Sequence, residues 1–203
     1  MKVYKVMPGV FASDSNCYLV TGDGKSAVAI DPSSDKALRE AERLGLTVGA
    51  ALLTHGHYDH VGGCFALSGM GIPIYCSQAE DALVHGKDSL YTVHCMPAPT
   101  FKTESVLKDG DRITLCGVEF SVIATPGHTA GSVTYVAERH MFSGDTLFEE
   151  SVGRTDLPTG DGAALADSVR KLYALEGDYT VHPGHGYDTT LEHERNYNMY
   201  IRA

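Results

Sequence analysis

The chain has 203 residues, which suits one domain, and its 43% hydrophobic and 21% charged residues are ordinary for a globular protein. Its formal net charge of −10 argues against nucleic acid as a partner, because binding to phosphates requires lysine and arginine. The five cysteines form no C-x-x-C pair, which argues against a disulfide framework or a four-cysteine zinc site and favours reduced thiols.

The first ten residues carry no apolar segment of the kind that secretory signals have. No stretch of the chain is long and apolar enough to span a bilayer. We therefore expect a cytoplasmic protein without a membrane partner, and the sequence leaves the oligomeric state open.

The first half of the chain alternates strand-like apolar runs with helical patterns. Strands are predicted at residues 2–6, 18–20 and 27–30. Ser34 is then suited to cap a helix with an apolar stripe, which Gly45 can end. A strand at residues 50–53, a helix at about 61–67 and a strand at 72–76 follow. Residues 84–105, which include Pro97 and Pro99, predict a helix end and a long loop that could act as a lid.

The second half of the chain resumes the alternation. Strands are predicted at residues 112–115, 119–124 and 132–136. Asp161 can cap an amphipathic helix, and Thr189 with Glu192 can form the capping box of a last helix. These elements predict an α/β or α+β fold in a single domain over residues 1–203, without fixing the order of the strands.

The most informative feature is the hexapeptide H-G-H-Y-D-H at residues 55–60, directly after a predicted strand. Imidazole and carboxylate groups are usual protein ligands of zinc. His55 and His57 point to the same side if the chain is extended, whereas Asp59 and His60 can face a second position as the chain enters a helix. One metal could not readily use all four groups and keep an open position, so the segment indicates two adjacent metals. The alternative is a polar surface turn.

Three further candidate ligands lie downstream, each beside a glycine and after a strand-like run. They are His128 in T-P-G-H-T-A-G-S, Asp145 in F-S-G-D-T and His185 in H-P-G-H-G. Glycine lets the backbone approach a site closely and adopt a positive φ. A lone histidine is more often structural, but together with the hexapeptide these residues indicate a metal centre.

The order H-x-H-x-D-H, H, D, H resembles that of the metallo-β-lactamase superfamily, over nearly the whole chain from Asn16 onward. Residues 126–132 and 143–148 are most similar to glyoxalase II (hydroxyacylglutathione hydrolase) and its short, single-domain relatives. The resemblance implies a four-layer αβ/βα sandwich with metals at one edge. It implies two divalent ions, zinc first and iron or manganese as alternatives. By motif position, the first ion is bound by His55, His57 and His128, the second by Asp59, His60 and His185, and both by Asp145.

The resemblance also implies a reaction, in which a hydroxide between the two metals attacks a thioester such as S-lactoylglutathione or a related activated ester. Asp59 and Asp145 would have catalytic roles as the carboxylates of this centre. The sequence shows no general acid beyond Asp59, which favours a thiolate leaving group, since a thiol has a pKa of about 8.5. We therefore expect a small acyl thioester substrate, with glutathione as a candidate thiol.

Two residues beside the motifs have paired interpretations. Asp31 ends a strand, and the resemblance implies that it hydrogen-bonds a ligand and fixes its orientation; the alternative is a simple helix-entry residue. Arg154 lies in S-V-G-R-T-D, a run similar to one in short glyoxalase II-like proteins and persulfide dioxygenases. Its guanidinium could hold a substrate carboxylate, or it could form a structural pair with Asp156.

Two rival functions stay open. A persulfide dioxygenase would use one iron held by His55, His128 and Asp145, and a non-catalytic module could have kept the fold. Cys64, four residues after His60, could be a ligand, but it fits a small core position better. The histidines without motif context are expected to be surface or structural residues: His85, His94, His140, His182 and His193.

Overall fold

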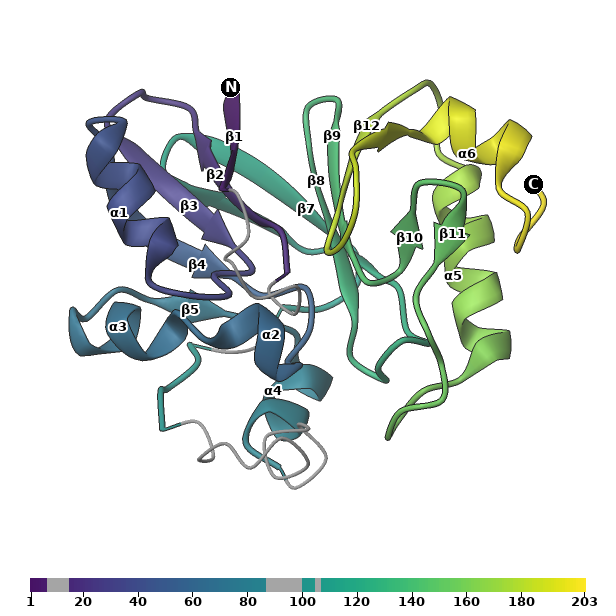
Figure 1. The fold of residues 1–203 in the computed structure, drawn as a ribbon, viewed down its shortest axis with the longest axis horizontal. Helices are drawn as coiled ribbons and strands as arrows, with labels where there is room; N and C mark the ends of the chain where they lie inside the picture. The colour runs from purple at the N-terminus through teal and green to yellow at the C-terminus, as the bar shows by residue number, and fades with distance from the viewer. Residues whose placement is uncertain (7–14, 87–99, 105–106) are drawn as a thin grey trace.

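Two β-sheets pack face to face in the computed structural model, which describes residues 1–6, 15–86, 100–104 and 107–203 (Figure 1). The first sheet has the strand order β1 (Lys2–Val6), β2 (Cys17–Thr21), β3 (Ser26–Ile30), β4 (Thr47–Leu52), β5 (Ile74–Tyr75). The second has the order β13 (Thr189–Thr190), β12 (Thr180–Pro183), β9 (His140–Gly144), β8 (Val133–Ala137), β7 (Val118–Ala124), β6 (Arg112–Leu115). A separate small hairpin is formed by β10 (Leu147–Phe148) and β11 (Ser151–Val152).

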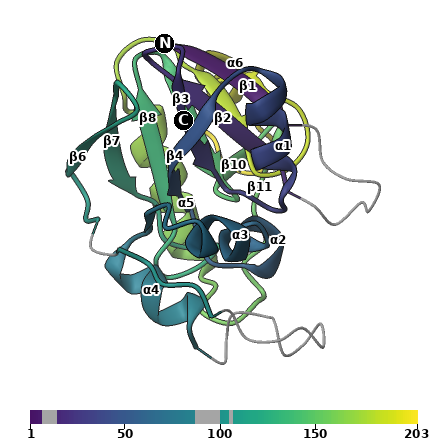
Figure 2. The ribbon, with the colours of Figure 1, turned by 90° about the vertical axis from the view of Figure 1, so that its left-hand side faces the viewer.

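Helices cover the outer faces of the two sheets. Figures 1 and 2 show α1 (Lys36–Arg43), α2 (Tyr58–Val61) and α3 (Cys64–Gly69) beside the first sheet. On the second sheet lie α5 (Gly162–Tyr173) and α6 (Leu191–Tyr197), and α4 (Gln78–Val84) follows β5. The resulting order of helix, sheet, sheet, helix confirms the predicted four-layer sandwich.

The alternation of side chains along the strands divides the core into layers. In β2 and β3, Leu19 and Ala29 pack with the helices on the outer face, whereas Tyr18 and Ile30 pack against the second sheet. A third cluster, which includes Met141, lies between the second sheet and the helices α5 and α6. Full burial of one such large aliphatic side chain contributes roughly 1.5–3 kcal/mol to the stability of the fold. The packed layers therefore hold the two sheets in place, and with them the edge at which the loops converge.

The helix ends differ in part from the sequence predictions. Asp161 caps α5 as predicted, because its carboxylate accepts hydrogen bonds from two backbone N–H groups at 2.8 and 3.0 Å. The prediction that Ser34 caps α1 is wrong: Asp35 is the N-cap, and its carboxylate pairs with Arg39 at 2.8 Å instead of with the helix backbone.

The capping box predicted for the last helix is also wrong by one residue. Thr190 caps α6 and accepts a hydrogen bond from the backbone of His193 at 3.1 Å. Thr189 instead donates its hydroxyl to the buried carboxylate of Glu194 at 2.7 Å. The β-hairpin at β10 and β11 has strands of two residues each, too short for a periodicity to predict.

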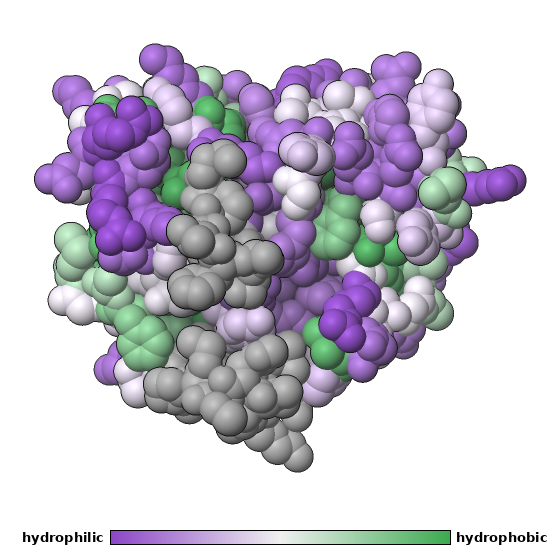
Figure 3. All heavy atoms as spheres, viewed as in Figure 1, coloured by the Kyte–Doolittle hydropathy of each residue, from purple (hydrophilic) through white to green (hydrophobic). Residues whose placement is uncertain are grey.

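Part of the long loop predicted at residues 84–105, with His94, lies outside the described residues. None of the described helices is of a length and hydrophobicity that would let it cross a membrane. On the face drawn in Figure 3, hydrophilic residues cover most of the coloured surface, and the hydrophobic residues occur in small groups.

Candidate metal centre

The seven predicted ligands all follow the ends of strands. The hexapeptide comes after β4, His128 after β7, Asp145 after β9 and His185 after β12. Asp31 likewise comes directly after β3, with a positive φ of 48°. The hydrogen-bonded sheets are rigid, so the loops that leave them can bring side chains from distant parts of the sequence to one place.

A first group of three histidines forms where two of these loops meet. The Nδ1 atom of His57 lies 2.8 Å from Nε2 of His128, and with a ring nitrogen of His55 the three candidate ligand atoms lie within 4.8 Å of one another. All three side chains are buried. Three imidazoles that converge in this way have the composition of a site for a divalent transition metal.

A second group contains Asp59, His60 and His185, whose candidate ligand atoms also lie within 4.8 Å of one another. The Oδ2 atom of Asp59 lies 3.2 Å from Nε2 of His185 and 3.8 Å from Nε2 of His60. This group therefore offers two imidazoles and one carboxylate beside the first group.

Asp145 lies between the two groups. Its Oδ1 atom is 3.4 Å from Nε2 of His60, and its Oδ2 atom is 3.5 Å from Nε2 of both His128 and His185. One carboxylate thus faces histidines of both groups. The structure brings together all seven side chains that the sequence singled out as ligands.

Several atoms of the cluster have no hydrogen-bond partner within the part of the chain that the structure describes. The Nε2 atoms of His55 and His60 and the Oδ1 atom of Asp145 are buried and make no hydrogen bond to the described residues. A buried polar atom left unsatisfied costs about 1–3 kcal/mol. Cations at this place would satisfy these atoms, so the residues fit the divalent metals that the sequence predicts.

The electrostatics of the two groups differ. Burial, followed by the neighbouring histidines, lowers the pKa of His57 to about 3 and the pKa of His55 well below its usual value. Burial alone would also lower the pKa of His60, but the carboxylates of Asp145 and Asp59 raise it well above its usual value. In the metal-free protein His55 and His57 are therefore neutral at pH 7, as metal ligands must be, whereas a metal that binds His60 displaces a proton.

Hydrogen bonds behind the cluster set the orientation of the imidazole rings. Asp31 accepts from Nδ1 of His60 at 3.0 Å, and it also accepts from the backbone N–H and the hydroxyl of Thr54 at 2.7 and 2.6 Å. The hydroxyl of Thr54 lies 3.1 Å from Nδ1 of His55. When Nδ1 carries the proton, Nε2 is left with its lone pair directed at the cluster.

We expect Asp31→Asn to weaken metal binding by roughly 10- to 100-fold, the usual effect of losing such a partner of a ligand histidine. Asparagine tolerates the positive φ of this position, but its amide group cannot accept all three hydrogen bonds. Metal affinity is measured by competition with a chelator. The matched control is Asp188→Asn, which removes a similar 2.7 Å contact to His182 outside the ligand groups; equal losses in both variants would refute the orienting role.

The sequence did not reveal what holds His128. Its Nδ1 atom lies 2.8 Å from the backbone carbonyl oxygen of Arg154, which can accept the ring N–H. The residue before Arg154 must be glycine, because a Cβ atom at Gly153 would collide with the carbonyl oxygen of Asp145. The sequence signal for this contact is the glycine of the S-V-G-R-T-D run, and not the arginine side chain that follows it.

A cavity of about 480 Å³ opens beside the cluster. Ligand side chains of both groups form part of its lining, and its other walls come from α2, the β10–β11 hairpin and the loop that follows, through Tyr58, Phe148, Ser151, Val152, Arg154 and Leu157. The Arg154 guanidinium is exposed and makes two 2.7 Å contacts with the carboxylate of Asp156. The structural pair predicted as the alternative is therefore present, at the rim of the cavity.

Residues 10–185 match the model of the metallo-beta-lactamase superfamily, and the chain belongs to this superfamily. It is 33% identical to hydroxyacylglutathione hydrolase GloC of Haemophilus influenzae, over 96% of each chain. It is 34% identical to the probable metallo-hydrolase M6_Spy0554 of Streptococcus pyogenes serotype M6, over 99% of this chain and 90% of that one.

Solved structures agree with this assignment. The BLEG-1 B3 metallo-beta-lactamase superposes with a TM-score of 0.90 at 33% identity, over the full length of both chains. TTHA1623, solved in a di-iron-bound form, gives a TM-score of 0.83 at 36% identity, over 97% of this chain and all of that one. ETHE1 from Myxococcus xanthus gives a TM-score of 0.80 at 26% identity, over 98% of this chain and 84% of that one.

Proposed function

We propose that this protein is a hydrolase with two divalent metal ions that cleaves small acyl thioesters, with S-lactoylglutathione as the leading candidate. The observation that carries the proposal is the position of Asp145 between two groups of ligands, each with buried atoms that lack a hydrogen-bond partner among the described residues. A relative at 33% identity bears the name hydroxyacylglutathione hydrolase, which supports the choice of thioester.

The assignment of ligands follows the two groups. The first metal would be held by His55, His57 and His128, the second by Asp59, His60 and His185, with Asp145 shared. When bound, such a pair of divalent ions lowers the pKa of a water molecule and stabilises negative charge on a carbonyl oxygen. Zinc suits these ligands, and iron and manganese accept the same donor set.

The side chains of this protein contribute position and charge. The carboxylates of Asp59 and Asp145 face the cavity and supply the negative charge that holds two cations close together. Among the described residues that line the cavity, every carboxylic acid and every imidazole belongs to the proposed ligands. The leaving group therefore has no free acid of these kinds to protonate it, which favours a thiolate.

The substrate prediction can be tested at the rim of the cavity. We expect Arg154→Ala to raise KM for glutathione thioesters about fivefold, since an exposed ion pair contributes at most about 1 kcal/mol. KM for a neutral thioester should stay unchanged. Steady-state kinetics on both substrates measure the difference.

The matched variant is Asp156→Asn, which removes the present partner of Arg154 and should lower KM for the charged substrate only. Equal changes for charged and neutral thioesters in both variants would leave Arg154 with the structural role alone.

The alternative of a persulfide dioxygenase with one iron at His55, His128 and Asp145 gives no role to the second group. Yet His60 and His185 lie within 3.5 Å of the Asp145 carboxylate. The direct test of the proposed function is hydrolysis of S-lactoylglutathione by the metal-loaded protein. Activity should disappear with a chelator and return on adding back zinc, iron or manganese; activity that survives complete metal removal would refute the proposal.

A further inference from the structure

Glu80 is a completely buried carboxylate that is not among the proposed ligands. It lies in α4, and its two oxygen atoms accept hydrogen bonds from two different loops. Oε1 accepts from the backbone N–H of Gly56 at 2.6 Å, and Oε2 accepts from the hydroxyl of Thr129 at 2.8 Å.

Both donors are direct neighbours of ligands. Gly56 separates His55 from His57, and Thr129 follows His128. One carboxylate therefore joins the two loops that carry the first group of histidines. These are the loops whose ligand atoms, Nδ1 of His57 and Nε2 of His128, lie 2.8 Å apart.

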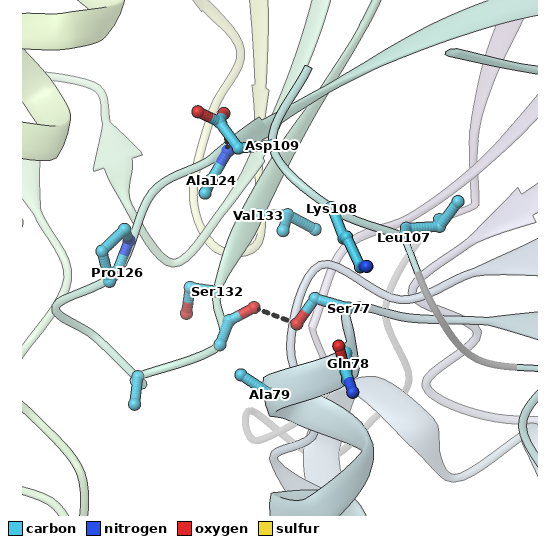
Figure 4. Close-up of a pocket in the computed structure, with 12 residues that line it drawn as sticks. Ser77, Gln78, Ala79, Leu107, Lys108, Asp109, Ala124, Pro126, Ser132 and Val133 are labelled. Atoms are coloured by element: carbon cyan, nitrogen blue, oxygen red, sulfur yellow. Dashed lines mark hydrogen bonds between the residues drawn. The ribbon is translucent and has the colours of Figure 1, made fainter. Parts of the chain in front are cut away.

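The first turn of α4 holds the second of these loops at another point. Ser77 caps the helix by accepting from the backbone N–H of Glu80 at 3.0 Å, and its hydroxyl donates to the carbonyl oxygen of Gly131 at 2.6 Å, the dashed line in Figure 4. The packing leaves no space between helix and loops. A Cβ atom at Gly131 would collide with Glu80, and one at Gly56 would collide with Val84.

The position of Glu80 is a costly one for a carboxylate. Burial raises the pKa of Glu80 to about 7, although the hydrogen bonds from Thr129 and Gly56 act in the opposite direction. A buried carboxylate adds little to the stability of a fold, because the cost of its desolvation offsets most of the free energy that its contacts contribute. The presence of Glu80 at this buried position is better explained by its hydrogen bonds to the two loops, which it holds together.

We propose that Glu80 is a positioning residue for the first metal, which fixes the distance between the His55–His57 loop and His128 through Gly56 and Thr129. This inference rests on the proposed metal centre. The second group has a different support, because Asp31 contacts His60. Loss of Glu80 should therefore affect the two metal positions unequally.

The test is a titration of metal-free protein with Zn²⁺ or Co²⁺ in competition with a chromophoric chelator, which resolves the two binding steps. We expect Glu80→Ala to weaken one step by roughly 10- to 100-fold, as for other partners that orient metal ligands, and to leave the other within about threefold. Glu80→Gln keeps a carbonyl oxygen for Gly56 and an amide that can donate to Thr129, so it should recover most of the affinity.

The matched control is Glu194→Ala. Glu194 is also completely buried. It accepts hydrogen bonds from the backbone N–H of Glu150, the side-chain amide of Asn198 and the hydroxyl of Thr189, and none of these residues adjoins a ligand. Its loss should lower the melting temperature and leave both metal affinities unchanged. If Glu80→Ala does not fold, Thr129→Val removes one donor while keeping the size of the side chain, and the same step should weaken.

Two results would overturn the proposal: wild-type affinity for both metals in Glu80→Ala, or equal losses in Glu80→Ala and Glu194→Ala. The readout is metal affinity and not turnover. A failure of thioester hydrolysis would therefore count against the proposed substrate and leave the result on Glu80 standing.

Discussion

Asp145→Ala should remove metal from both positions and lower kcat/KM by roughly a thousandfold or more, because metal-ion catalysis supplies several kcal/mol of charge stabilisation. The reason is geometric. The two oxygen atoms of Asp145 face different groups, Oδ1 toward His60 and Oδ2 toward His128 and His185. In the proposed centre, its loss would remove the carboxylate shared by two cations and leave their mutual repulsion uncompensated.

Elemental analysis after dialysis, with kinetics on the same sample, measures this effect. Asp145→Asn should lower metal content and kcat/KM almost as much, since it keeps the shape of the side chain and loses the charge. His57→Ala should affect mainly the first metal. Asp23→Ala, at an exposed turn, is the control and should change neither quantity. Two metals per chain with normal turnover in Asp145→Ala would refute the shared carboxylate.

Thioesters should be hydrolysed faster than matched amides by roughly 10²–10⁴, the usual contribution of a positioned general acid that this cavity lacks for an amine. Among the described residues that line it, the acids and imidazoles are the proposed ligands. A thiolate leaves without protonation, because the pKa of its thiol is about 8.5, whereas alkoxides and amide anions are far more basic. Activated lactones and aryl esters should fall between thioesters and unstrained amides.

The measurement is kcat/KM over a series that shares one acyl group and differs in the leaving atom, with the protein holding its native metal. Amide cleavage as fast as thioester cleavage would be the contradicting result. It would require an acid outside the ligand groups, and His182 and Tyr187 are the described residues to replace first. His182 is buried and contacts Asp188 at 2.7 Å, whereas Tyr187 is exposed.

The ligands could be predicted from sequence because each is marked locally. A strand, a glycine and a histidine or aspartate occur together, and the strand ends carry those residues to one edge of the sandwich, as for Asp145 after β9. The four layers follow from the resemblance to the metallo-β-lactamase superfamily, because the residue pattern alone predicts only an α/β or α+β fold. The structure shows the two buried faces of the first sheet, with Leu19 on the outer face and Tyr18 against the second sheet.

Contacts made by the backbone or across the fold could not be predicted. The carbonyl oxygen of Arg154 orients His128, and any residue type has a carbonyl oxygen. Glu80 stands in an S-x-x-E sequence that predicts a helix start, and Ser77 does cap α4. The sequence does not predict that the Glu80 carboxylate accepts hydrogen bonds from Gly56 and Thr129 and not from the helix backbone. Those partners come from other parts of the chain.

The metal content of the purified protein tests the central claim most directly. We predict two divalent ions per chain, because Asp145 faces both ligand groups and buried nitrogen atoms of His55 and His60 lack hydrogen-bond partners among the described residues. Removing these ions should abolish thioester hydrolysis. One iron per chain, with full occupancy and no hydrolysis of any thioester, would contradict the account and favour a mononuclear oxygenase centre at His55, His128 and Asp145.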